Sequence, residues 1–125
     1  MHYISVESCR SPEQLTRAVL QVSEMLGMYR AELARVLGLQ CGDIGTLLND
    51  KQYLKPDTEA WQQARSFIDF YQILYKRMDG KEPEICHWLR SDNADLKGVP
   101  LLLMVDDGQL PRVRQYLLKQ TRSSQ

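Results

Sequence analysis

The chain has little of what marks several common classes of protein. Its 125 residues hold three widely spaced cysteines and no Cys-x-x-Cys pair, which excludes a disulfide framework and a zinc ribbon. The longest apolar run, residues 99–105, is far shorter than the ~20 residues of a membrane-spanning helix. No basic flank and apolar segment follow the first residues, as they would in a signal peptide. We therefore expect a cytoplasmic protein with reduced thiols and no membrane association.

Neither sign of charge is in excess, since 16 Lys and Arg residues balance 16 Asp and Glu residues. This balance argues against a protein that coats nucleic acid or anionic membranes through its bulk charge. The charge is unevenly placed, because the charged residues after Gly108 are all basic: Arg112, Arg114, Lys119 and Arg122. Such a run is either a solvated helix face or a surface for a partner.

Catalytic and metal-binding patterns are also missing. Cys86 and His87 are adjacent, so on a helix their side chains diverge by about 100°, and no further ligands stand at a recognised spacing. Asp106 and Asp107 precede Gly108 and are explained by the polar end of a helix. No glycine-rich phosphate loop follows a strand. We expect no enzymatic activity, no cofactor and no bound metal.

What the sequence does contain is apolar residues at helical spacing, and nothing in it calls for a sheet. The pattern predicts an all-α protein, with residues 1–10 as a loose arm. Residues 101–105 are assigned to a short, buried helix because Pro100 suits a first helical position and Gly108 follows the end. The other predicted helices cover residues 12–26, 29–37, 41–48, 57–78, 82–89 and 110–120. We divide the chain into a helix-turn-helix region (1–56), a long connecting helix (57–79) and a C-terminal module (80–125).

The sequence also predicts two helix caps, the orientation of one leucine and the role of an aromatic stripe. Ser11 is expected to cap the first helix and Asp57 the long one, while Leu48 is expected to face inward. The long helix carries an aromatic stripe, which predicts either core or the interface of a homodimer: Trp61, Phe67, Tyr71 and Tyr75.

The segment from Arg30 to Asn49 fits the register of a helix-turn-helix. Ala34 is the small residue needed where two helices cross, and Gly38 supplies the turn. Four apolar residues fall in the same register: Leu33, Leu39, Ile44 and Leu47. The stretch Glu32–Leu39 resembles the helix-turn-helix of Xre-type repressors. The alternative is an ordinary helical hairpin with a glycine corner.

DNA binding by this segment is a separate question. In the standard docking the start of the second helix enters the major groove, where Gln40, Thr46 and Asn49 offer hydrogen bonds. However, two of its residues are glycines, Asp43 repels phosphate, and no Arg or Lys lies between positions 35 and 51. The segment either binds DNA weakly or serves as a packing or dimerisation module.

A second pattern spans about 30 residues near the C-terminus. A tryptophan-leucine pair closes a helix, an asparagine caps a turn, and glycine and proline lead into the next helix: Trp88, Leu89, Asn93, Leu96, Gly98, Pro100, Leu101, Leu103, Gly108 and Val113. This layout resembles the toxin-binding domain of the Xre/MbcA/ParS antitoxin family, whose members carry an Xre-like helix-turn-helix upstream. The resemblance covers residues 28–118. The chain departs from the family at Asp92, where proline is usual, and at Met104-Val105-Asp106.

The resemblance implies an antitoxin that blocks a RES-domain toxin, which depletes NAD, and that binds the promoter of its own operon. In such families the C-terminal region covers the active site of the toxin. We expect toxin contacts from Arg112, Arg114 and Tyr116, with the Arg112/Tyr116 face favoured because Arg112 and Arg114 point in different directions. Trp88 and Leu89 are expected to be structural. The alternative is an Xre-type transcriptional regulator with no toxin partner, and in both cases we expect a homodimer.

Overall fold

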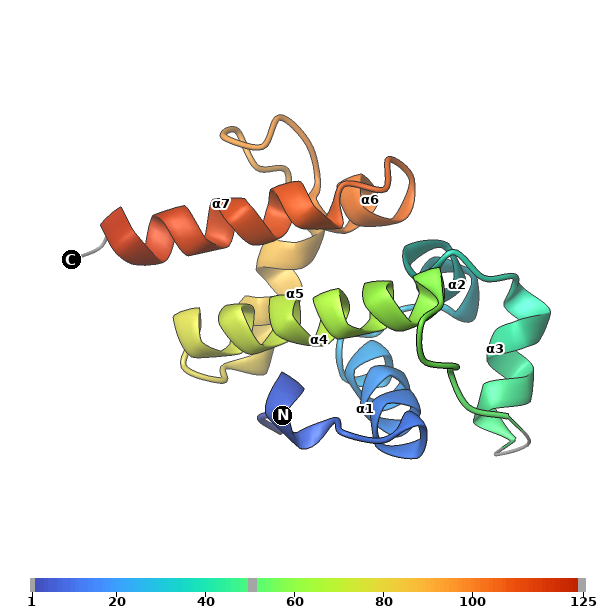
Figure 1. The fold of residues 1–125 in the computed structure, drawn as a ribbon. Coiled ribbons are helices and arrows are strands. Elements are labelled where there is room, and N and C mark those ends of the chain that lie inside the picture. The colour runs from blue at the N-terminus through green and yellow to red at the C-terminus, as the bar shows by residue number, and fades with distance from the viewer. Residues whose placement is uncertain (1, 50–51, 124–125) are drawn as a thin grey trace.

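The computed structural model describes residues 2–49 and 52–123, with only the backbone of residues 120–123. Within these residues the chain is all-α, as the sequence predicts, and contains no strand. A short 3-10 turn at Val6–Ser8 precedes seven helices (Figure 1). These are α1 (Pro12–Met25), α2 (Arg30–Leu37), α3 (Cys41–Leu48), α4 (Glu59–Arg77), α5 (Glu82–Arg90), α6 (Pro100–Val105) and α7 (Leu110–Ser123).

Local chemistry accounts for where the helices begin. The Ser11 hydroxyl accepts a hydrogen bond from the Gln14 N–H at 3.1 Å, and the Gln14 side chain accepts one from the Ser11 N–H at 3.2 Å. This reciprocal cap confirms the predicted start of α1. At α4 the prediction was wrong, because the cap is Thr58, whose hydroxyl accepts from the Trp61 N–H at 3.2 Å. Asp57 has a φ of +65°, which is incompatible with the extended backbone of a capping residue.

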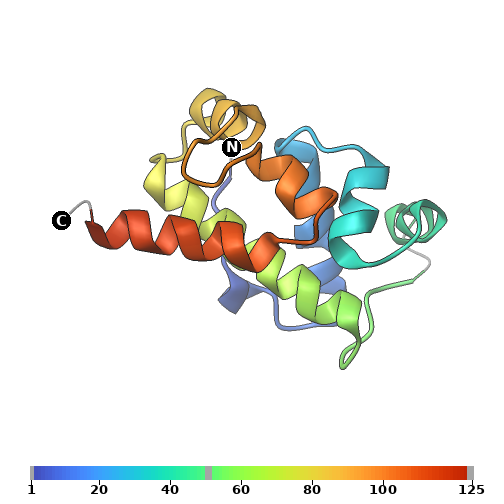
Figure 2. The same cartoon turned by 90° about the horizontal axis from the view of Figure 1, so that it is seen from above.

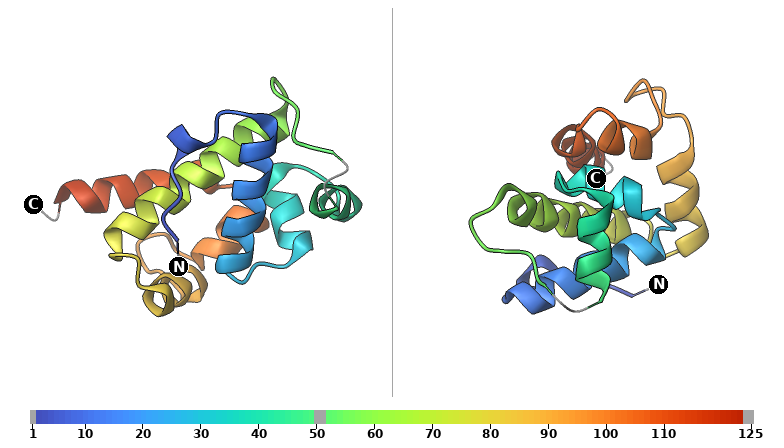
Figure 3. Two further views of the ribbon diagram at one scale, coloured as in Figure 1. Left: turned by 90° about the horizontal axis from the view of Figure 1, so that it is seen from below. Right: turned by 90° about the vertical axis from the view of Figure 1, so that its right-hand side faces the viewer.

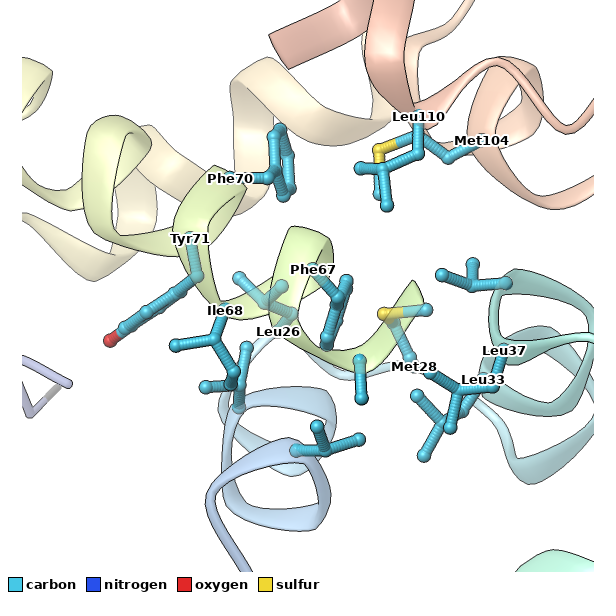
Figure 4. Close-up of a cluster of buried hydrophobic side chains, with 14 of the residues drawn as sticks. Leu26, Met28, Leu33, Leu37, Phe67, Ile68, Phe70, Tyr71, Met104 and Leu110 are labelled. Carbon is cyan, nitrogen blue, oxygen red and sulfur yellow. The ribbon is translucent and has the colours of Figure 1, made fainter. Parts of the chain in front are cut away.

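Helix α4 runs through the middle of the molecule and organises its core. Helices α1 and α2 pack against it on one side and α7 runs over it on the other (Figures 1 and 2). Phe67, Ile68, Phe70 and Tyr71 are completely buried between these neighbours (Figure 4). The buried apolar residues form one cluster to which all seven helices contribute. The N-terminal and C-terminal parts of the chain therefore share a single core.

Two leucines that the sequence predicts as buried are exposed. Leu48 on α3 is 43% exposed, because α3 packs mainly on α2 and only the face with Ile44 and Leu47 is covered. Leu102 on α6 is 48% exposed, because this short helix buries the residues on either side of it against α2, α5 and α7. The run of leucines could not reveal which residue faces outward.

Residues 2–10 do not form the predicted loose arm. The Val6 N–H donates to the Oε1 of Gln72 on α4 at 3.1 Å, and Cys9 is buried in the core. Burial also raises the pKa of the Cys9 thiol, and the hydrogen bond with Ser8 partly offsets this rise. Of the other cysteines, Cys86 is partly buried and Cys41 is exposed.

The buried hydroxyl of Tyr71 predicts a loss of stability in alkali. It donates to the backbone oxygen of His2, and burial raises its pKa above the ordinary value, with further contributions from Tyr75 and Glu82. The folded chain thus holds this proton more tightly than the unfolded chain. The resulting stabilisation is complete below about pH 10, the pKa in the unfolded chain, and declines above it by up to ~1.4 kcal/mol per pH unit.

We expect the free energy of unfolding in urea to fall as the pH rises from about 10 to about 11. The variant Tyr71→Phe should have a smaller slope over this range, since it removes the titrating hydroxyl. The matched control is Tyr53→Phe in an exposed segment, which should keep the slope of the parent chain. An unchanged slope in Tyr71→Phe would refute the assignment.

Candidate functional site

Helices α2 and α3 meet at a glycine turn. Gly38 ends α2 with a φ of +73°, a left-handed conformation that favours glycine. The Leu39 N–H then donates to the Ala34 oxygen at 2.8 Å, which closes the turn. Ala34 is 3% exposed, so it has the buried position expected of a small residue between two packed helices. The structure therefore places Ala34 and Gly38 where the sequence register requires them.

The three residues predicted to contact DNA are spread along α3. Gln40 is exposed just before the helix, and its N–H donates to Asp43 Oδ2 at 3.0 Å. Thr46 is partly exposed and its hydroxyl donates to the Gly42 oxygen at 3.3 Å, while Asn49 is exposed at the far end. A Cβ atom added at Gly42 would meet nothing within 4 Å. The outer surface of α3 is thus open and shallow, with hydrogen-bonding groups at both ends.

The nearest basic residue upstream of α3 is engaged elsewhere. Arg35 on α2 forms an ion pair with Asp106 at the end of α6, with Nη1 and Oδ1 2.7 Å apart. Arg90 on α5 donates to the Gly27 oxygen at 2.9 Å. The first contact ties α2 to α6, and the second ties the turn between α1 and α2 to α5. A DNA phosphate would therefore have to compete with Asp106 for Arg35.

In the C-terminal part, the pattern residues build a closed loop between α5 and α6. The Asn93 side-chain oxygen accepts from the N–H groups of Asp95 and Leu96 at 3.0 and 3.1 Å. The Asn93 and Gly98 backbones exchange two hydrogen bonds of 2.9 and 3.2 Å. A Cβ atom at Gly98 would lie 3.3 Å from a methyl carbon of Leu103, so glycine permits the close approach of loop and helix.

Four further pattern residues lie at the ends of α5 and α6. Pro100 is the first residue of α6 and is buried, and Gly108 has a φ of +61° in the turn before α7. Leu89 is completely buried. Trp88 is only partly exposed, and it lines an open groove of about 660 Å³ with Met78 and Pro83.

The predicted toxin contacts separate into two sites. Arg112 and Tyr116 line one groove of about 200 Å³ with Asp95 and Leu96. Arg112 donates to the Leu96 oxygen at 2.8 Å, and the Tyr116 hydroxyl donates to Asp95 Oδ2 at 2.9 Å. Burial, and then the bond to Asp95, raise the pKa of Tyr116. This surface is therefore held in place by contacts within the chain.

Arg114 lies on another side of α7. Its Nε bonds to the carboxylate of Asp69 on α4, and both side chains are about one-third exposed. The position of Arg114 is explained by packing of α7 on α4, whereas Arg112 faces the groove. The side chain of Arg122, the last basic residue of the predicted cluster, lies outside the described part of the chain.

The sequence missed two exposed apolar residues that are candidates for interfaces. Leu102 was assigned to the core, and Tyr29, which is 77% exposed just before α2, was not considered as a contact. The sequence contains one indication of a special role for Tyr29, because a tyrosine occupies a helix start where Ser, Thr, Asp or Asn is favoured.

Two further observations concern the described residues only. Between residues 2 and 123, leaving out 50–51, no three His, Cys, Asp or Glu side chains lie together as a metal site. No helix in this part of the chain has both the length and the apolar character of a membrane span. The absence of cofactors and of catalysis remains a prediction.

Comparison with protein-family models found none that matches the chain, and comparison with curated proteins found no match either. The function must therefore be inferred from the residues and their geometry.

Proposed function

We propose that the chain is the antitoxin of a type II toxin–antitoxin system, that it binds and blocks a RES-domain toxin that depletes NAD, and that it represses its own operon through DNA binding. The observation that carries this proposal is the loop and helix arrangement of residues 88–108. Asn93, Gly98, Pro100 and Gly108 each have a conformational or capping role there that agrees with the antitoxin pattern.

The groove on α7 supports a role in partner binding. A partly buried tyrosine and an arginine lie side by side in it, and these two residue types are enriched among the residues that dominate binding energy. The groove is pre-formed, since Arg112 and Tyr116 are fixed to the loop at Leu96 and Asp95. A pre-formed surface loses less side-chain freedom on binding. Inhibition would then result from covering the toxin, with no chemistry by this chain.

The DNA-binding part of the proposal predicts weak binding by the isolated chain. α3 itself carries an acid and no base, and Arg35 is already paired with Asp106. We expect binding to the promoter upstream of its gene to weaken steeply with salt, because phosphate contacts rather than base contacts would supply most of the affinity. Fluorescence anisotropy in low and physiological salt measures this.

The variant Thr46→Ala should reduce that affinity by less than about tenfold, because the Thr46 hydroxyl already donates within the helix. The control is Thr58→Ser, which keeps a hydroxyl to cap α4 and changes none of the residues predicted to contact DNA. A tight complex at physiological salt that is lost in Thr46→Ala would contradict this picture.

Co-purification with the RES-domain protein encoded beside its gene tests the proposal. The full chain should be used, because a chain ending at Asp79 would lose α7 and expose buried Phe70 on α4. We expect a stable complex through size-exclusion chromatography. Failure to form it, together with specific promoter binding, would favour an Xre-type regulator without a toxin, in which the exposed Gln40 and Asn49 contact DNA.

A further inference from the structure

A groove of about 460 Å³ opens between α1, α2 and α3, outside the surfaces discussed above. Its base is apolar: Met28, Leu33 and Ile44 are at most 9% exposed, and Leu48, 43% exposed, stands at its side. Helix α3 lies at the opposite end of the molecule from the end of α7 (Figures 1 and 3). This groove and the Arg112 groove have no lining residue in common.

Next to the groove stands the most exposed of the large apolar side chains, Tyr29. It lies between Met28 and Arg30, which both line the groove. Tyr29 occupies the capping position of α2, and within the described chain its side chain caps nothing. Half of a reciprocal cap is nevertheless present, since Glu32 accepts from the Tyr29 N–H at 2.8 Å. Serine at this position would complete the cap, so the tyrosine is not there to stabilise the helix.

We propose that this face binds a second copy of the chain, with Tyr29 of each copy entering the apolar groove of the other. A projecting side chain directly beside a groove is the arrangement that a twofold axis can satisfy twice, because each copy then supplies both halves of the contact. The occupant is thus the chain itself. This inference goes beyond the proposed function and depends on neither the toxin nor DNA.

The charges around the groove are self-complementary. Arg17 and Arg30 line it together with Glu24, and Arg17 is already paired with Glu13 at 2.8 Å. In a twofold contact, Arg30 of one copy can meet Glu24 of the second copy, and the same pair forms again across the axis. The formal net charge of the whole chain is zero, so two copies do not repel one another through their bulk charge.

This location differs from the aromatic stripe on α4, which the sequence predicts to be either core or a dimer interface. Phe67 and Tyr71 on α4 are completely buried within one chain and are unavailable to a second copy. The groove lining includes none of Gln40, Thr46 and Asn49, the three residues that the sequence predicts to contact DNA.

Sedimentation equilibrium of the full chain, from tens to hundreds of micromolar, tests the interface. We expect the parent chain to dimerise and Tyr29→Ser to raise the dissociation constant at least ~100-fold, since an aromatic anchor is lost twice per dimer. The melting temperature of Tyr29→Ser, measured at a concentration where both proteins are monomers, should equal or exceed that of the parent, because the cap is completed. The control Tyr53→Ser, in an exposed segment away from this groove, should dimerise like the parent.

A charge exchange tests the pairing across the axis. Arg30→Glu should weaken the dimer, because it places a carboxylate against Glu24 of the second copy, and adding Glu24→Arg should restore it. A parent chain that is monomeric over the whole range would overturn the proposal, as would a Tyr29→Ser variant that dimerises unchanged. If Tyr29→Ser kept its mass but lost promoter affinity, this face would contact DNA and the dimer interface would be wrong.

Discussion

Replacing Leu89 with alanine should lower the free energy of unfolding by ~3–5 kcal/mol. The side chain is completely buried at the end of α5, where this helix meets α6. Alanine leaves a cavity that rigid neighbours on two helices can only partly fill. Trp88→Ala should cost less, because Trp88 is partly exposed in an open groove and its removal enlarges that groove without creating a closed cavity.

Leu89→Ala also tests whether the chain folds as one unit. Since one apolar cluster includes residues from all seven helices, urea should unfold the parent chain and Leu89→Ala in a single transition. The matched control is Leu102→Ala, the same change at a position that is 48% exposed, which should shift stability by no more than about 0.5 kcal/mol. Two separate transitions, with only one of them moved by Leu89→Ala, would show that residues 80–125 fold independently.

The second large effect concerns the proposed toxin complex. Arg112→Ala should weaken binding to the RES-domain toxin by about 10- to 100-fold, as expected for an arginine at the centre of an interface. The reason is its position in the groove beside Tyr116, where the guanidinium is exposed and oriented by the Leu96 oxygen. Isothermal titration calorimetry with purified partners measures the change.

Arg114→Ala is the matched control, because it removes the same side chain two residues away on the same helix. It should leave toxin affinity within about twofold of the parent chain, since a surface position away from the contact is near neutral. It should instead lower stability by about 1 kcal/mol, because Asp69 loses a partly exposed ion-pair partner. Equal losses of affinity in both variants would show that the groove is not the contact surface.

Elements governed by local chemistry could be predicted closely from the sequence. The bounds of α3, Cys41–Leu48, are those predicted, and the Ser11-Pro12 start of α1 is confirmed by its reciprocal cap. The left-handed Gly38 between α2 and α3 follows from the same logic. Each of these features depends on residues within about four positions of one another, so one segment of sequence contains the information.

Features that depend on distant neighbours could not be predicted. Leu48 and Leu102 look like core residues, yet no helix covers them, and neighbours in space cannot be counted from periodicity. Val6 is tied to α4 by its hydrogen bond to Gln72, which lies 66 positions away in the sequence. The cap of α4 is a local feature, and here the prediction erred by one position: the cap is Thr58, not Asp57, a difference within the usual uncertainty of helix boundaries.

In the candidate site, too, features set by nearby residues could be predicted and features set by distant residues could not. The angle between successive helical residues correctly predicted that Arg112 and Arg114 face different ways. It could not reveal that Asp69, 45 positions away, pairs with Arg114, or that the Leu96 oxygen orients Arg112. The position of Tyr29 at the start of a helix can be read from the sequence, but its exposure cannot. Without that exposure, nothing marks Tyr29 as a candidate contact.

Inhibition of the toxin is tested most directly by the NAD-consuming activity of a purified RES-domain toxin, the proposed partner, measured while the full chain is added in steps. NAD consumption should fall in proportion to the added chain and stop at a fixed stoichiometric ratio, since inhibition requires one binding surface per toxin active site. NAD consumption that continues unchanged in a molar excess of the folded chain would contradict it.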